Sequence, residues 1–138
     1  MDTVQEGALA LDVQPTSVTL WIPGPLPGMN EIIDEARRNR FASAKLKAGW
    51  TNTVALLAKA AKIPRYESAK FAFTWVEKSK LRNPDNISAG MKFIFDGLQL
   101  AGVIENDGWS QVLGIAHSFG VNKDKPGVVV VISGTLRP

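Results

Sequence analysis

Residues 127–134 read Gly-Val-Val-Val-Val-Ile-Ser-Gly, and this run constrains the fold more than any other stretch of the chain. β-branched side chains are stiff at χ1 and pack well on a pleated surface, so the run predicts a β-strand. Because apolar residues are consecutive rather than alternating, we expect both faces of this strand to be covered.

Three further segments have the composition of strands. Residues 70–78 alternate polar and apolar side chains strictly, and residues 16–22 alternate while being rich in Val, Thr, Ile and Trp. Residues 110–120 form the third segment. Alternation with a period of two places one set of side chains on each face, so we expect four strands in all.

Apolar residues recur at helical spacing in three segments between the expected strands. The patterns predict helices over residues 31–38, 42–62 and 84–101. Strands and helices mixed in a chain of this size favour an α+β fold, a small mixed β-sheet with packed helices. We expect a flexible N-terminus over residues 1–14 and a single domain over residues 15–138.

The composition excludes several classes of protein. The chain has no cysteine, so it has neither disulfides nor a thiolate metal site. No apolar run is long enough to span a bilayer, and the acidic N-terminus lacks the basic start of a secretory signal. These features predict a cytoplasmic protein with no membrane partner.

Positive charge is concentrated in one part of the chain. The net charge is only +3, yet residues 37–82 contain twelve Lys or Arg and two Glu, a local balance of +10. Such a field attracts polyanions and speeds their approach, which indicates nucleic acid. A solvated surface that keeps the protein dissolved would have the same composition, and charge alone favours neither interpretation.

The expected helix over residues 84–101 carries charge on one side only. At 100° per residue, Asp85, Lys92 and Asp96 fall within a narrow arc, and the large apolar side chains lie opposite. A polar stripe is the ordinary outer face of a surface helix, and Lys92 with Asp96 could form a weak i,i+4 ion pair. The other interpretation is a functional site.

A second acidic segment follows this helix. Glu105, Asn106 and Asp107 precede Gly108, which by itself is typical of a surface turn. Together with the helix, this segment would supply a carboxylate from a separate element, as metal-assisted phosphodiester hydrolysis requires. Mg²⁺ prefers oxygen ligands, and a nearby lysine can neutralise charge on the phosphate. We expect Trp109, which comes next, to pack in the core rather than against DNA.

Three blocks together resemble the RusA-like endonucleases that resolve Holliday junctions, most closely those of bacteriophages. The blocks are Arg-Asn-Pro-Asp-Asn at residues 82–86, Lys92 ahead of Phe-Asp-Gly-Leu, and the acidic segment at residues 101–112. The resemblance covers most of the chain. It implies a RusA-like fold and metal-dependent nicking of four-way DNA junctions, in recombination, repair or phage DNA processing within a bacterial host.

Carried over to this chain, the resemblance implies a site for Mg²⁺ or Mn²⁺. Asp85 and Asp107 match the family's metal-binding and catalytic acids, and Lys92 matches its catalytic lysine. Asn86 matches the motif's asparagine, which would orient Asp85 by a hydrogen bond. Asp96 also has a family counterpart, with a less defined role.

Asn83 departs from the family pattern, which has a further aspartate at this position. We assign Asn83 to the metal and catalytic set, although an amide oxygen brings no charge and should weaken the metal site. The change could be an inactivating substitution that traps an enzyme on its substrate, which the otherwise intact set favours. Alternatively, the chain is a natural non-catalytic protein that binds branched DNA. A third interpretation is a basic domain that binds RNA.

Basic residues near the acidic motif and on the two preceding helices are the expected DNA contacts, because they could grip phosphates. A symmetric cut needs two sites, so we expect a homodimer with branched DNA as its partner. The residues assigned to DNA binding are Lys78, Lys80, Arg82, Arg37, Arg38, Arg40, Lys45 and Lys47.

Overall fold

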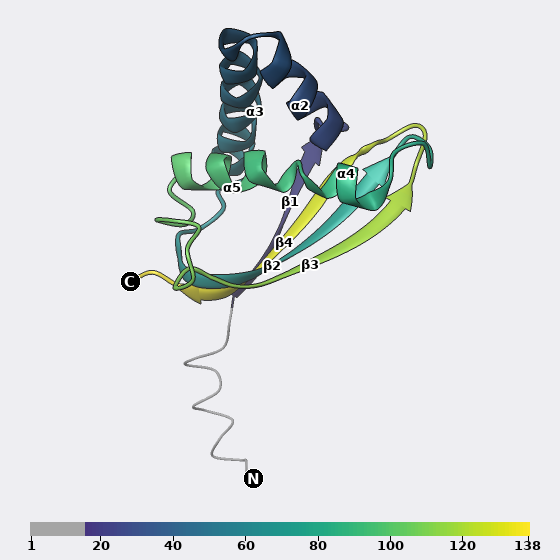
Figure 1. Cartoon of the computed structure of the whole chain (residues 1–138). Coiled ribbons are helices and arrows are strands. Elements are labelled where there is room, and N and C mark those ends of the chain that lie inside the picture. The colour runs from purple at the N-terminus through teal and green to yellow at the C-terminus, as the bar shows by residue number, and fades with distance from the viewer. Residues whose placement is uncertain (1–15) are drawn as a thin grey trace.

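Four strands form one mixed sheet in the structure, a computed structural model that describes residues 16–138 (Figure 1). The strands are β1 (Thr16–Pro23), β2 (Tyr66–Glu77), β3 (Val112–Val121) and β4 (Gly127–Leu136), in the order β1-β4-β2-β3. β4 runs antiparallel to β1 and β2, and β3 runs parallel to β2. The predicted α+β fold with a small mixed sheet is confirmed, whereas the prediction for residues 1–14 lies outside the described residues.

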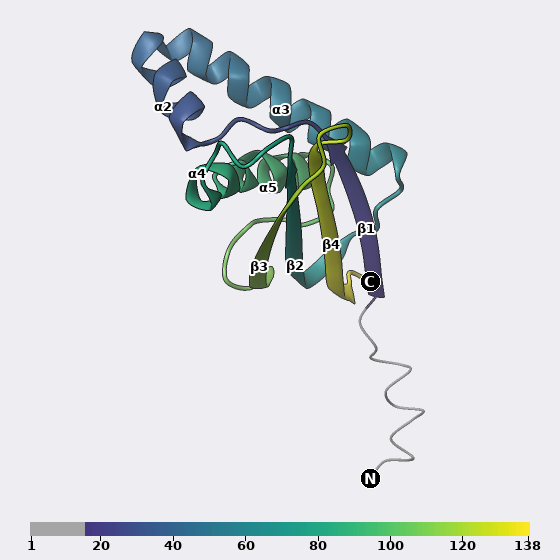
Figure 2. The same cartoon turned by 90° about the vertical axis from the view of Figure 1, so that its right-hand side faces the viewer.

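The helices of the described residues lie on one side of the sheet (Figure 2). They are α2 (Met29–Arg38), α3 (Arg40–Ala60), α4 (Pro84–Ser88) and α5 (Met91–Leu100). α4 and α5 connect β2 to β3 and lie across the sheet, and the long α3 packs on α5 from the far side (Figures 1 and 2). Between residues 16 and 138, no helix has both the length and the apolar character needed to cross a membrane.

The helix-covered face of the sheet contains the core. In β2, Phe71, Phe73 and Trp75 are each 1% exposed, and the residues between them face away. The alternation of residues 70–78 therefore predicted this strand and its buried face correctly. In β4, Val130 and Ile132 are fully buried beside them.

The opposite face of β4 corrects one prediction. Val129 and Val131 are only half-buried, since no layer of residues 16–138 packs on that side. The β-branched run over residues 127–134 thus has one fully covered face instead of two. Its position between β1 and β2 satisfies its backbone on both sides, which explains the strand preference of the run.

The helix predicted over residues 84–101 is broken after Ser88. Gly90 and Phe93 donate to the carbonyl oxygens three residues earlier, at 3.2 and 3.1 Å, so the chain tightens between α4 and α5. A Cβ at position 90 would lie 3.1 Å from Cβ of Leu26 and 3.2 Å from the Trp75 ring, which explains the glycine. The prediction of one continuous helix is therefore wrong, and the position of Asp85 relative to Lys92 and Asp96 no longer follows from helical spacing.

Gly97 sets the separation of α5 from α3. A Cβ there would overlap Cβ of Val54 and lie 2.9 Å from the carbonyl oxygen of Thr51. We expect Gly97→Ala to lower the free energy of unfolding by about 1–3 kcal/mol, because overpacking outweighs the better helix propensity of alanine.

Gly49 provides the matched control, since it lies within α3 and a Cβ there would meet nothing within 4 Å. Gly49→Ala should raise the free energy of unfolding by up to about 1 kcal/mol. Urea denaturation of both variants measures the two effects. Equal effects of the same sign would contradict close packing of α3 on α5.

Candidate functional site

The acidic motif begins α4. The carbonyl oxygen of Asn83 accepts hydrogen bonds from the backbone N–H groups of Asn86 and Ile87, both at 3.0 Å. The Asn83 side chain makes no capping hydrogen bond and is exposed, as is Asp85. The only hydrogen bond between these two side chains and the first turn of α4 is made by Asp85, whose Oδ1 accepts the backbone N–H of Asn86 at 2.9 Å.

Asn86 connects this motif to the first turn of α2. Its side-chain Oδ1 accepts the backbone N–H of Asn30 at 2.9 Å, across 56 residues of sequence. Asn86 therefore contacts Asp85 through its backbone, and its side chain binds the first turn of α2 instead of orienting Asp85 as predicted. Asn30, Asn83, Asp85 and Asn86 line a polar recess of about 490 Å³.

Arg82 binds three parts of the chain at once. Its Nε and Nη2 donate to the two carboxylate oxygens of Glu77 at 2.9 and 2.8 Å. Its Nη1 donates to Glu31 Oε1 and to the carbonyl oxygen of Leu26, both at 3.0 Å. Hydrogen bonding to Glu77 raises the pKa of Arg82 above its usual value. The guanidinium predicted to contact DNA is instead occupied by partners within the protein, where it holds α4 to the loop before α2.

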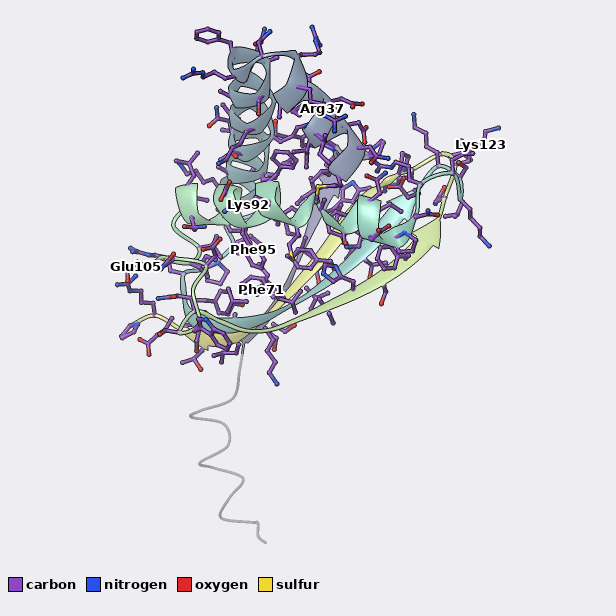
Figure 3. All side chains as sticks on the ribbon, viewed as in Figure 1. Arg37, Phe71, Lys92, Phe95, Glu105 and Lys123 are labelled. Carbon is purple, nitrogen blue, oxygen red and sulfur yellow. The ribbon has the colours of Figure 1, made fainter. Side chains whose placement is uncertain are left out.

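Lys92 joins the central helix to the acidic segment after it. Lys92 Nζ lies 3.1 Å from Asp96 Oδ1 and 3.6 Å from Asp107 Oδ2. The hydrogen bond to Asp96 is the main reason that the pKa of Lys92 is raised. The i,i+4 pair is present as predicted, and the two sequence blocks also meet at this lysine. Figure 3 shows Lys92 on α5 above the sheet.

The second oxygen of Asp96 faces α3. It is buried without a hydrogen-bond partner, and Lys47 Nζ lies 3.9 Å away. Asp96 and Lys47 line a recess of about 680 Å³ that also includes Thr51, whose hydroxyl has no partner either. Asp96 therefore lies between two lysines, one from each helix.

The donor atoms of the predicted metal site fit a hard divalent cation, because Asn83, Asp85 and Asp107 all offer oxygen. Within residues 16–138, no group of three or more Asp, Glu, His or Cys side chains could hold a metal ion. The predicted metal ligands are two carboxylates, Asp85 and Asp107, and the amide of Asn83. The convergence of Asp85 with Asp107 stays a prediction, whereas that of Lys92 with Asp107 is a feature of the structure.

The basic surface extends over two regions. On α2 and α3, the predicted contacts Arg37, Arg38, Arg40, Lys45 and Lys47 are exposed, although Arg38 pairs with Glu35 at 2.9 Å. Lys78 and Lys80 are exposed in the loop after β2.

Sequence reasoning missed the turn between β3 and β4 as part of this basic surface. It carries Lys123 and Lys125 at the same end of the sheet as Lys78, because the Asn122 N–H donates to the Glu77 carbonyl at 2.9 Å. Lys123 lies at the tip of this turn (Figure 3). The local pattern Asn-Lys-Asp-Lys was the available signal.

Trp109 is 97% exposed, so the prediction that it packs in the core is wrong. It lies two residues after Asp107, in the loop that carries the acidic segment. Leu81, next to the other acidic motif, is 90% exposed. Single exposed apolar side chains are common on protein surfaces, so neither residue defines a contact surface by itself.

No protein-family model and no curated protein matches the chain.

Proposed function

We propose that the protein is a structure-specific, divalent-metal-dependent endonuclease that nicks four-way DNA junctions as a RusA-like homodimer in the bacterial cytoplasm. The observation that carries the proposal is the 3.6 Å contact between Lys92 Nζ and Asp107 Oδ2. It joins the two blocks of sequence whose combination resembles those nucleases. The exposed basic residues on α2, α3 and two loops supply the surface for phosphate contacts.

Asp85, Asp107 and the residue at position 83 would hold the cation. When bound, such a cation polarises the phosphodiester and lowers the pKa of a bound water molecule. Lys92 is protonated at neutral pH, as lysines ordinarily are, and its two carboxylate neighbours raise its pKa further. Its positive charge stabilises negative charge that develops on a phosphate beside Asp107.

Two groups position this site without taking part in the chemistry. Arg82 fixes the segment before α4 by its bonds to Glu77 and Glu31. Asn86 ties the first turn of α4 to Asn30. Both restrict the backbone that carries Asn83 and Asp85, and a small displacement of such groups is costly for catalysis.

A non-catalytic protein that binds branched DNA is the second candidate, and Asn83 favours it. A carboxylate is missing from the set, and only two acids are left to offset the charge of a cation. The same basic surface would serve either function.

The test is to compare the protein with its Asn83→Asp variant on a labelled four-way junction in Mg²⁺. We expect the variant to nick the junction about 100-fold faster, the scale on which one electrostatic group contributes. Asp is as good as Asn at the start of a helix, so the fold should tolerate the change. Calorimetry should also show tighter Mg²⁺ binding by the variant.

Asn83→Ala is the matched control and should gain neither cleavage nor metal affinity. A linear duplex of the same sequence tests the preference for branched DNA, and an RNA competitor at fixed salt tests the third interpretation. If Asn83→Asp binds junctions and never nicks them, the enzyme proposal fails and the binding protein stands.

A further inference from the structure

β3 is an edge strand without the usual protection. It pairs with β2 on one side, and no strand of residues 16–138 pairs with its other side. Edge strands commonly carry charges, proline or bulges that prevent pairing with another chain. The ten residues of β3 include no Asp, Glu, Lys, Arg or Pro, and its only register shift is at its first residues. Its free backbone groups are therefore available to another strand.

Four large apolar side chains of β3 lie at the edge of the sheet, where they are only partly covered. Leu113, Ile115, Phe119 and Val121 are between 42% and 56% exposed. Ile115 and Phe119 are register partners of the buried Phe71 and Trp75, so they point to the helix-covered face. We call these four residues the β3 ledge.

The side chains of β3 are arranged symmetrically about His117. Leu113 corresponds to Val121, and Ile115 corresponds to Phe119. On the other face, Gly114 corresponds to Gly120 and Ala116 to Ser118. An antiparallel pair of two such strands centred on His117 places large apolar residues opposite large apolar residues, and small opposite small. The strand is therefore complementary to itself.

Charge also favours a second copy as the occupant. The chain carries a net +3 and a strong positive excess over residues 37–82, so most surfaces of two copies repel each other. β3 has no formal charge at neutral pH, because burial lowers the pKa of His117 and its Nδ1 accepts the Trp75 Nε1–H at 2.9 Å. Antiparallel pairing also brings the turn with Lys123 and Lys125 toward the acidic loop that precedes β3 in the second copy.

We propose that two copies pair through β3 in antiparallel register about His117, which forms one continuous eight-stranded sheet. The two-fold axis is perpendicular to the sheet, so the helices of both copies lie on the same side. Phe119 and Val121 line a recess of about 500 Å³ together with Asn83, and the ledge of the second copy would lie at this recess. The need for a homodimer rests on the proposed function, whereas the choice of β3 rests on the strand itself.

The oligomeric state of the full chain without DNA tests the inference. Analytical ultracentrifugation should show a dimer, and Ile115→Lys should weaken it by roughly 100-fold because an unpaired charge then lies opposite the apolar Phe119 of the second copy. Leu56→Lys is the control, since Leu56 is an exposed residue of α3, 69% accessible, and it should leave the dimer intact. Far-UV circular dichroism checks that both variants are folded.

A second variant uses the absence of cysteine in the chain. His117→Cys places two thiols opposite each other at the axis, where Cα atoms of paired residues lie about 4.5–5.5 Å apart, within disulfide range. Oxidation should give a covalent dimer, and Leu56→Cys should not.

A monomeric protein, or a dimer unaffected by Ile115→Lys and not linked through position 117, would overturn the inference. A monomer that nicks junctions as Asn83→Asp would leave the proposed nuclease activity standing and contradict only its dimeric form. A β3-linked dimer that neither binds nor nicks junctions would contradict the function alone.

Discussion

Replacing Arg82 with alanine should lower the free energy of unfolding by about 3–5 kcal/mol, the cost of removing one partner from a buried ion pair. Glu77, its bidentate partner, is 8% exposed and would remain as a charge with little access to water. Glu31 and the carbonyl oxygen of Leu26 would also lose their donor. Urea denaturation followed by circular dichroism measures the loss.

Two control variants distinguish the loss of the Arg82–Glu77 ion pair from the general effect of removing a positive charge. Lys80→Ala removes an exposed neighbouring charge and should change stability by no more than about 0.5 kcal/mol. Glu77→Leu combined with Arg82→Met should recover most of the loss, since no unpaired buried charge remains. An Arg82→Ala protein as stable as Lys80→Ala would show that the ion pair contributes little.

The same change should weaken the functional site by loosening its support. Arg82 and the Gly28 N–H both bind Glu31 Oε1, at 3.0 and 2.8 Å, and a Cβ at Gly28 would crowd Asn86 Oδ1 at 2.7 Å. The loop before α2 thus fits closely against the motif at Asn83 and Asp85. This network fixes the position of the backbone from which those two side chains extend.

The sequence was sufficient for most strands, because alternation records directly which side chains face a core. β2 and β4 follow their patterns on the helix-covered face. The break between α4 and α5 was not predictable, since it arises from the approach of Leu26 and Trp75 to Gly90, both distant in sequence. Local periodicity contains no information about such a contact.

The contacts of the candidate site also differ in whether local sequence spacing could predict them. The Lys92–Asp96 pair follows from helical spacing alone, and the Lys92–Asp107 contact followed only from reading two blocks together. Arg82 was counted as a free charge, yet it is compensated by Glu77, five residues away at the end of β2, and by Glu31, 51 residues away. The turn that brings Glu77 back onto Arg82 leaves no periodic signal in the sequence. Exposure of Trp109 also depends on the path of a loop, which composition does not determine.

Lys92→Gln, made in the Asn83→Asp protein, should reduce junction nicking by about 100–1,000-fold, the effect of removing one group that stabilises developing charge. Stability should fall by no more than about 1 kcal/mol, because the Lys92 side chain is 60% exposed and such ion pairs are weak. Junction affinity should change little, since one phosphate contact among many is lost. Single-turnover cleavage, urea denaturation and a binding titration measure the three quantities.

Lys47→Gln is the matched control, because Lys47 is equally exposed at 60% and also lies near Asp96, but not near Asp107. It should leave the cleavage rate within a few-fold and reduce the salt dependence of binding by about one phosphate contact. Lys92→Arg keeps the charge and should retain part of the activity. If Lys92→Gln and Lys47→Gln slow cleavage equally, then proximity to Asp107 has no special role and Lys92 acts only as part of the basic surface.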